Sequence, residues 1–303
     1  MRGQRVSSVG DRYRLGRRQL LAALCVSFGM TVGGTGAVVA SGKKAGTIRF
    51  GLTPVFLTND LELLGGLRHY LAKATGHDVE LVTRRTYQEV TSLLVTGELD
   101  AAWICGYPFV KFRDALDLVA VPDWNGSPYY RSYLIVGSDR AVESIEELGG
   151  DIHAYSDPDS NSGYLVTQAL LHELDLSPNR FFRDAMFTYG HRNVIRAVAS
   201  RLAQSGSVDG YVWEVMREIE PELVNRTRIL RRSEWLGFPP VAANRRVAQT
   251  EKMQSLSQAF LAMSESEEGR DVLRMLRLTG FSLPEDEIYR SIAEKVEALK
   301  GVL

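Results

Sequence analysis

The sequence predicts an α/β fold of two lobes with a ligand-binding cleft between them. Strand and helix patterns alternate from residue 47 onward, and a similar order of patterns returns after residue 145. Such alternation is typical of sheets covered by helices, and 303 residues are enough for two lobes. Ligands of open α/β sheets bind outside the carboxyl ends of the strands, so two facing lobes would form a cleft.

The first lobe is predicted to alternate three strands with two helices: strand 47–51, helix 60–75, strand 79–82, helix 87–96 and strand 100–105. Leu61, Leu64 and Leu67 have the spacing of an amphipathic helix. Gly76 and Gly97 are typical helix stops. These patterns predict a parallel sheet covered by helices.

The second lobe is predicted from a strand at 152–156, a helix after Gly163, a helix at 193–200, and an aspartate followed by an apolar aromatic strand at 211–213. Helices from Thr250 to the C-terminus are expected to pack on the first lobe. We therefore predict lobe 1 at 47–135 plus 240–303, and lobe 2 at 136–239.

Residues 1–41 resemble an export signal. A leader rich in arginine precedes an apolar run at 20–39 and small residues near position 40. The Arg17-Arg18 pair resembles a twin-arginine signal. The run is also long enough for a membrane anchor, but its glycines favour cleavage. The mature protein is expected in the periplasm, with Cys105 as its single cysteine.

Composition and motifs argue against several classes of function. The formal net charge is −1, so no basic surplus indicates a nucleic-acid partner. The five histidines lack metal-ligand spacing, and zincin, nucleophile-elbow and phosphate-loop motifs are missing. Cys105 and His191 could form a nucleophile–base pair, but no cysteine-hydrolase motif surrounds them. We expect a protein that is not an enzyme and needs no cofactor.

The segment 157–164, Asp-Pro-Asp-Ser-Asn-Ser-Gly-Tyr, is the predicted anion site. It precedes an amphipathic helical pattern, and the unpaired N–H groups of a helix start attract oxyanions. Ser160 and Ser162 could add hydroxyl donors, and Gly163 could let a ligand approach the backbone. The alternative is an ordinary helix cap without a ligand.

Four further segments occur in an order that resembles one family. Together with 157–164, the segments 105–109, 190–191, 208–214 and 279–289 resemble the phosphate-, phosphite- and phosphonate-binding periplasmic proteins. The resemblance covers the mature chain and implies the type II periplasmic binding protein fold. It also implies a set of ligand-binding residues: Thr53, Phe56, Cys105, Tyr107, Ser160, Asn161, Ser162, Gly163, Tyr164, His191, Tyr211, Trp213 and Glu214.

Within this set, Ser160 to Gly163 would hold the oxyanion and His191 would point into the cleft. Tyr211, Trp213 and Glu214 would line the cleft floor or, for the two rings, belong to the core. Thr53 and Phe56 would face them from the other lobe. The loop 235–240, which is polar in the family, is apolar here.

Cys105 directs the preferred hypothesis toward arsenite. Trivalent arsenic exchanges a hydroxyl for a thiolate sulfur, whereas phosphonate oxygens need only N–H and O–H donors. Cys105 resembles the cleft cysteine of arsenite-sensing periplasmic proteins that signal to a membrane sensor histidine kinase. The sequence therefore predicts an arsenite sensor with Cys105 as the arsenic ligand. The alternatives are the substrate-binding component of an ABC transporter for phosphonate, phosphite or phosphate, which would meet a permease, and an inorganic phosphate sensor.

Overall fold

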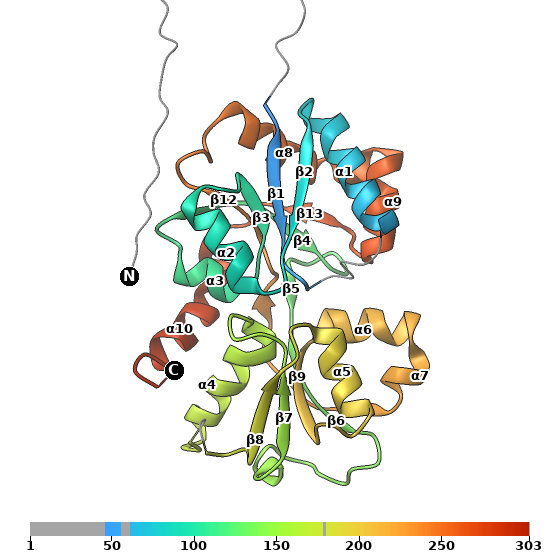
Figure 1. The fold of residues 1–303 in the computed structure, drawn as a ribbon, viewed down its shortest axis with the longest axis vertical. Helices are drawn as coiled ribbons and strands as arrows, with labels where there is room; N and C mark the ends of the chain where they lie inside the picture. The colour runs from blue at the N-terminus through green and yellow to red at the C-terminus, as the bar shows by residue number, and fades with distance from the viewer. Residues whose placement is uncertain (1–45, 56–60, 178–179, 303) are drawn as a thin grey trace, which may run out of the picture. The chain divides into compact units, whose positions relative to one another are not determined.

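The computed structural model describes residues 46–55, 61–177 and 180–302. The predicted export signal and Phe56 lie outside the described residues. Residues 43–303 belong to one compact unit, which contains two sheets of five or more strands (Figure 1).

The first sheet has the strand order β13-β4-β12-β3-β1-β2. Its parallel part consists of β1 (Ile48–Leu52), β2 (Val79–Thr83) and β3 (Ala101–Trp103). The strands β4 (Leu116–Asp123), β12 (Val241–Asn244) and β13 (Gly280–Ser282) join antiparallel. The prediction of a parallel sheet is therefore correct for only half of its strands, because β12 and β13 return from the distant C-terminal part of the chain.

Two helices of this lobe, α1 (Leu61–Thr75) and α2 (Tyr87–Thr96), begin and end close to the predicted residues. A short third helix, α3 (Gly106–Lys111), was not predicted. Thr86 and Glu89 form a reciprocal capping box at the start of α2, and Gly97 ends it with a left-handed φ of 84°. Both boundary signals are local, which explains why the sequence located this helix correctly.

The second sheet has the order β10-β6-β9-β7-β8. Its strands are β6 (Ser132–Gly137), β7 (Ile152–Tyr155), β8 (Asp184–Phe187), β9 (Ser205–Asp209) and β10 (Thr227–Arg232). β7 pairs parallel with both β8 and β9. β6 pairs antiparallel with β9 on one side and with β10 on the other. Four helices accompany this sheet: α4 (Val166–Glu173), α5 (His191–Ala199), α6 (Gly210–Ile219) and α7 (Pro221–Val224).

One predicted strand is a helix in the structure. Residues 211–213 belong to α6, while the strand β9 lies before Asp209. The Asp209 carboxylate accepts hydrogen bonds from the N–H groups of Tyr211 (2.9 Å) and Val212 (3.3 Å). This N-cap starts a helix directly after the strand, so the apparent repeat of the first lobe ends at this aspartate.

Two chain crossings connect the sheets. The short strands β5 (Tyr129–Tyr130) and β11 (Leu236–Gly237) lie on the two crossings and pair antiparallel with each other. The apolar loop after β11 is buried, and its carbonyls accept bonds from Trp103 Nε1 (2.9 Å to Pro239 O) and Tyr289 Oη (2.8 Å to Phe238 O). Core packing therefore accounts for the apolar character of this loop.

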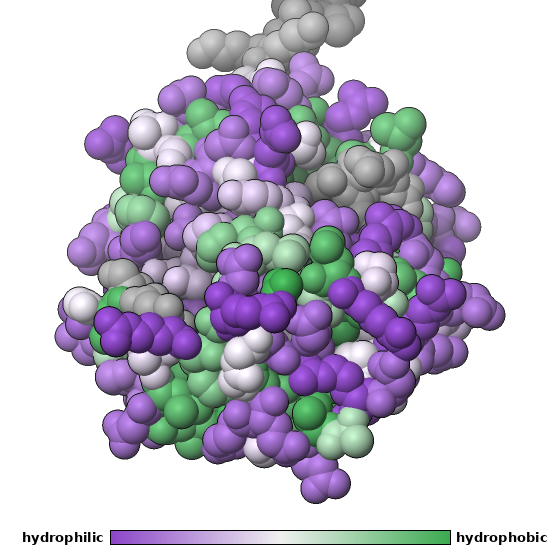
Figure 2. Space-filling view, turned by 60° about the horizontal axis from the view of Figure 1, so that its bottom comes forward, coloured by the Kyte–Doolittle hydropathy of each residue, from purple (hydrophilic) through white to green (hydrophobic). Residues whose placement is uncertain are grey.

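The C-terminal part adds three longer helices. α8 (Glu251–Leu261) and α9 (Glu267–Leu276) contact α1, while α10 (Arg290–Ala298) contacts α3 (Figure 1). The surface shown in Figure 2 is mostly hydrophilic, with hydrophobic residues in smaller groups between hydrophilic ones.

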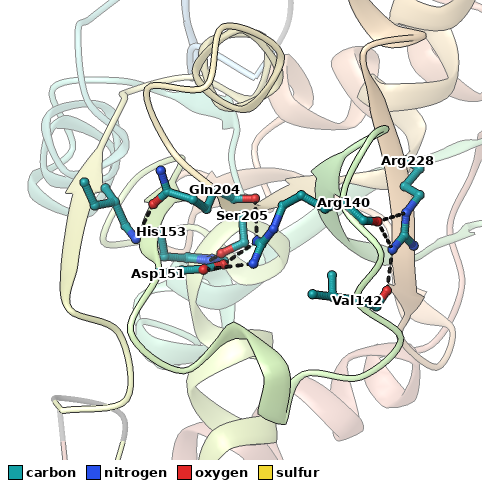
Figure 3. Close-up of polar contacts among 8 residues, drawn as sticks. Arg140, Val142, Asp151, His153, Gln204, Ser205 and Arg228 are labelled. Carbon is teal, nitrogen blue, oxygen red and sulfur yellow. Dashed lines mark hydrogen bonds and ion pairs between the residues drawn. The ribbon is translucent and has the colours of Figure 1, made fainter.

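A polar cluster stabilises the end of the second sheet that lies opposite the strand carboxyl ends. Arg140 forms a two-pronged pair with Asp151 (2.6 and 3.1 Å) and donates to the carbonyl of Gln204 (3.0 Å). Arg228 donates to the carbonyls of Arg140 and Val142 (Figure 3). These contacts tie the loop between β6 and β7 to Gln204 and to β10.

Candidate functional site

The carboxyl ends of parallel strands from both sheets meet at one place. Thr53 and Cys105 follow β1 and β3 in the first lobe. Asp157 follows β7 and Asp209 ends β9 in the second lobe. The two lobes are in direct contact here, as the backbone N–H of Tyr87 donates to Asp157 Oδ2 over 3.2 Å. This is the position at which open α/β sheets bind ligands.

The predicted anion segment forms a helix start at this position. Residues Asn161–Leu165 make one π-helical turn that continues into α4. The Ser160 hydroxyl caps the turn by accepting the N–H of Gly163 over 3.0 Å. Ser160 is thus the N-cap of this helix start. Single π turns occur often at functional sites.

Gly163 is required by packing inside the second lobe. A Cβ atom at this residue would lie 1.9 Å from Ser156 Oγ and 2.9 Å from Ser160 Oγ. The Gly163 carbonyl also accepts the Ser156 N–H over 3.2 Å. The glycine therefore lets the π turn pack directly on the end of β7.

Several buried polar atoms at this turn have no hydrogen-bond partner among the described residues. They are Asn161 Oδ1, Ser162 Oγ and Ser156 Oγ. Asn161 and Ser162 are almost fully buried. A buried polar atom without a hydrogen bond lowers the stability of the folded protein by about 1–3 kcal/mol. Such atoms are therefore rare, and a group of them indicates a place where a ligand could bind. The Asn161 Nδ2 donates across the cleft to Tyr130 Oη over 2.9 Å.

His191 is the first residue of α5 and is 2% exposed. Its Nδ1 accepts the N–H of Asp209 over 3.1 Å, so the hydrogen of the neutral ring lies on Nε2. Nε2 lies 3.3 Å from the Tyr87 hydroxyl of the first lobe. Burial lowers the pKa of His191 to about 3, so the ring is a neutral donor at physiological pH.

Cys105 lies at the N-cap of α3 and is 2% exposed. Its sulfur accepts the Asn161 N–H over 3.1 Å. Burial raises the pKa of the thiol to about 12, despite the lowering effect of N–H groups from Asn161 and Tyr107. The group is therefore a protonated thiol at neutral pH, whereas nucleophilic and metal-binding cysteines are thiolates.

Two buried carboxyl groups adjoin the same site. Burial raises the pKa of Asp209 to about 7, although the N–H groups of Val212 and Tyr211 act in the opposite direction. Burial also raises the pKa of Asp157, which caps the backbone of Asp159 and Tyr87. The site thus combines neutral donors with acids that burial drives toward the neutral form. Such a site can hold an oxyanion through N–H and O–H groups without a cationic side chain.

Burial raises the pKa of Tyr87 and of Tyr130 well above the ordinary value for a phenol, so both hydroxyls remain donors. The sequence did not indicate either residue as a ligand contact. Tyr87 marked only a helix start, and Tyr130 lies on a short crossing strand without a motif.

The other predicted site residues lie in different surroundings. The Thr53 hydroxyl is bonded to the carbonyl of Trp103 (3.0 Å). Tyr107 is half-buried under Lys111, with 5.7 Å from Nζ to the ring centroid. Tyr164 packs on Tyr155, with ring centroids 5.1 Å apart.

The three residues predicted for the cleft floor lie on α6. The Tyr211 hydroxyl donates to the carbonyl of Leu276, which joins α6 to α9. Trp213 packs on Tyr133 and donates to Thr227 Oγ1 over 3.2 Å, inside the second lobe. Glu214 pairs with Arg217 (2.7 Å). The structure thus brings Cys105, Asn161, Ser162 and His191 together, but places Trp213 and Glu214 in a separate cluster.

Within the described ranges, no group of three or more histidine, cysteine or acidic residues has the arrangement of a metal site. Over the same residues, every helix is too short or too polar to cross a membrane.

The sequence matches the family model described as "ABC transporter, phosphonate, periplasmic substrate-binding protein" over residues 50–289. The binding protein component of an ABC phosphonate transporter from Pseudomonas aeruginosa has a similar structure, with a TM-score of 0.77 and 19% identity. That comparison covers 85% of this chain and 89% of the other.

PhnD1 from Prochlorococcus marinus, solved in complex with methylphosphonate, gives a TM-score of 0.76 at 18% identity and covers 84% of this chain and 98% of that chain. The periplasmic aliphatic sulphonate binding protein SsuA from Escherichia coli gives 0.56 at 14% identity, covering 84% and 87%. Likeness at these identities shows the fold alone. The predicted type II periplasmic binding protein fold, with two α/β lobes, is confirmed.

Proposed function

The chain belongs to the family of periplasmic substrate-binding proteins of phosphonate ABC transporters, and on this premise we propose that it binds a small phosphonate-class anion and delivers it to a membrane permease. Members of this family are binding proteins of the periplasm. Transport then requires no reaction at the site, only capture and release. Export of this chain by a cleavable, twin-arginine-like signal within residues 1–41 is part of the proposal.

The observation that carries the proposal is the set of neutral donors around unpaired polar atoms at one helix start. The Tyr87 and Tyr130 hydroxyls approach from the first lobe. The Ser162 hydroxyl and His191 Nε2 approach from the second. A tetrahedral anion between them would replace the missing partners, and its charge would be held by the positive end of the helix.

Contacts from both lobes give a reason for closure. An anion that meets the Tyr87 hydroxyl and the Ser162 hydroxyl at once binds fully only when the lobes are together, so it shifts the population toward the closed state. A permease that recognises the closed state would then receive loaded protein in preference to empty protein.

The comparisons favour this transport function over the preferred hypothesis from the sequence, the arsenite sensor. The related proteins named above are phosphonate and sulphonate binding proteins, and none is named as an arsenite or kinase-linked protein. The buried Cys105 thiol with its raised pKa is also a weak nucleophile toward arsenic.

A thermal-melting panel tests the proposal. The mature protein is melted with methylphosphonate, phosphite, phosphate, sulfate or arsenite, each for the wild type and for Cys105→Ser. We expect methylphosphonate and phosphite to raise the melting temperature of both proteins. A shift produced by arsenite alone and lost in Cys105→Ser would replace the transport proposal with the sensor.

A further inference from the structure

A cavity of about 620 Å³ lies beside His191, between the two lobes. Binding pockets for whole small molecules have volumes of about 300–1,000 Å³. The cavity is far larger than a phosphonate group with a single methyl substituent requires. It therefore offers space for a larger part of a ligand.

One part of the cavity wall is apolar. Val55 and Leu63 line it from the first lobe, Val212, Val215 and Met216 from α6, and Met275 from α9. Four of these side chains are almost completely buried, and Met275 and Val215 pack on the same core. Water against this part of the wall gains few hydrogen bonds, so an apolar group can displace it at a gain in free energy.

The charged residues at the cavity already have a partner. Arg192 and Arg196 lie four residues apart on α5, and both pair with Glu220. One carboxylate faces two guanidinium groups, so their charges are only partly compensated, and their aliphatic stems extend the apolar part of the wall.

His191 belongs to both the cavity and the anion site. His191 is one of the residues that line the cavity, and its Nε2 lies 3.3 Å from the Tyr87 hydroxyl at the anion site. The cavity and the anion site therefore adjoin at this residue.

Tyr189 lies at the opening of the cavity with 49% of its surface exposed. Its φ of 52° is in the left-handed region, which is rare for a bulky residue. Such a conformation persists only where the surroundings enforce it, and it occurs often at binding sites. Here it holds an aromatic ring at the entrance to the apolar space.

We propose that this cavity holds the organic substituent of the anion, and that the protein prefers organophosphonates with an apolar substituent of several carbon atoms. The inference rests on the proposed function, because it takes the anion site as the place of the phosphonate group. Each buried methylene tightens binding by about fourfold at most. Hexylphosphonate is therefore expected to bind at least about tenfold tighter than methylphosphonate.

Calorimetric titration of the mature protein with methylphosphonate and hexylphosphonate tests the expected preference for the longer substituent. Val215→Trp fills the cavity from α6, and it is expected to weaken hexylphosphonate binding about tenfold or more while changing methylphosphonate binding by less than about twofold. Leu202→Trp is the control, since Leu202 is 60% exposed and precedes β9 at the other end of the strand.

A second variant guards against loss of folding. Asn tolerates the left-handed region, so Tyr189→Asn keeps the backbone and the melting temperature but removes the ring. Hexylphosphonate should bind it more weakly, and methylphosphonate should bind as to the wild type.

The outcomes distinguish failure of the substituent cavity from failure of the proposed phosphonate-binding function. Equal affinity for both ligands, or equal weakening of both by Val215→Trp, overturns the substituent cavity and leaves the proposed function standing. If neither phosphonate binds the wild type, the proposed function fails and this inference fails with it.

Discussion

The hydroxyl of Tyr87 lies 3.3 Å from Nε2 of His191, so the first residue of α2 in one lobe touches the first residue of α5 in the other. Both residues are buried, and the ring is neutral with its hydrogen on Nε2. The pair joins the starts of α2 and α5 beside the π turn that carries Ser162 Oγ and Asn161 Oδ1. Under the proposed function, the pair would donate to the anion and would form a contact between the lobes in the closed state.

Removal of the imidazole is expected to weaken anion binding. His191→Ala deletes a buried donor, which costs about 1–3 kcal/mol and lowers the affinity for methylphosphonate by roughly 5- to 150-fold. Calorimetric titration at neutral pH measures the change. His69→Ala changes an exposed histidine on α1 and serves as the control. An unaltered affinity in His191→Ala would place the anion elsewhere.

The anion affinity should also depend on the ionisation of Asp209. Its pKa is raised to about 7, so the carboxyl is neutral below that pH and gains a negative charge above it. Binding of an anion should therefore weaken as the pH rises through about 7. Asp209→Asn keeps an oxygen to cap α6 but cannot ionise, so its affinity should stay closer to constant.

The ligand's own ionisation affects the dissociation constants of wild type and Asp209→Asn equally. Its effect therefore cancels in the ratio of the two constants. Asp157, His191 and Cys105 are also titratable groups near this carboxyl, and they are the same in both proteins. A ratio that stays flat between about pH 6 and about pH 8.5 would show that Asp209 does not titrate near the anion.

Acid stability should depend on His153, which is fully buried in the second lobe. Its ring nitrogens are bonded to Ser205 and Ser207, each over 2.8 Å, and it stacks on Phe182. Burial lowers its pKa to about 3, against an ordinary value of 6.5. Below pH 6.5 the unfolded chain binds a proton that the folded chain does not, so stability is lost as the pH falls toward about 3.

The gap between 6.5 and about 3 corresponds to a loss of at most about 5 kcal/mol for this histidine. Urea unfolding between about pH 7.5 and about pH 4 measures the loss. His153→Gln should be less stable at neutral pH but should lose less stability on acidification. The raised pKa of Asp209 acts in the opposite direction and is common to both proteins. Parallel pH profiles of the two proteins would contradict the assignment.

Gly163 offers a test of the π turn. Gly163→Ala would place a methyl group 1.9 Å from Ser156 Oγ, so the second lobe should be destabilised by about 1–3 kcal/mol. Gly65→Ala on α1 meets nothing within 4 Å and should stabilise the helix by about 0.5–1 kcal/mol. Urea unfolding of both variants checks the contrast. Similar stability changes in the two variants would show that the π turn is not tightly packed.

Parts of the fold with local signals were predictable from the sequence. Helix α2 was located because its helical pattern and the Gly97 stop are signals within the segment itself. The strands β12 and β13 were not predicted as part of the first sheet, because their pairing with β3 and β4 depends on residues far away in the chain. The helical state of residues 211–213 was missed because the Asp209 cap was interpreted as a strand start.

The candidate site shows the same limit. Ser160, Ser162 and His191 follow recognisable motifs, and the structure brings the last two into one buried group with Asn161 and Cys105. Tyr130 gave no signal, since its role depends on a chain crossing that brings it to Asn161. Whether these residues hold a ligand stays a prediction.

The most direct test of the central claim is calorimetric titration of the mature protein with methylphosphonate, for wild type and Ser162→Ala. Ser162 Oγ is buried and forms no hydrogen bond of ordinary geometry in the described part of the chain, although it lies near the Tyr130 hydroxyl, so its removal is expected to affect the ligand more than the fold. We expect one site per molecule in the wild type, and an affinity lower by about 1–3 kcal/mol in the variant, with an unchanged melting temperature. Equal binding by both proteins, or no binding of any phosphonate by the wild type, would contradict the account.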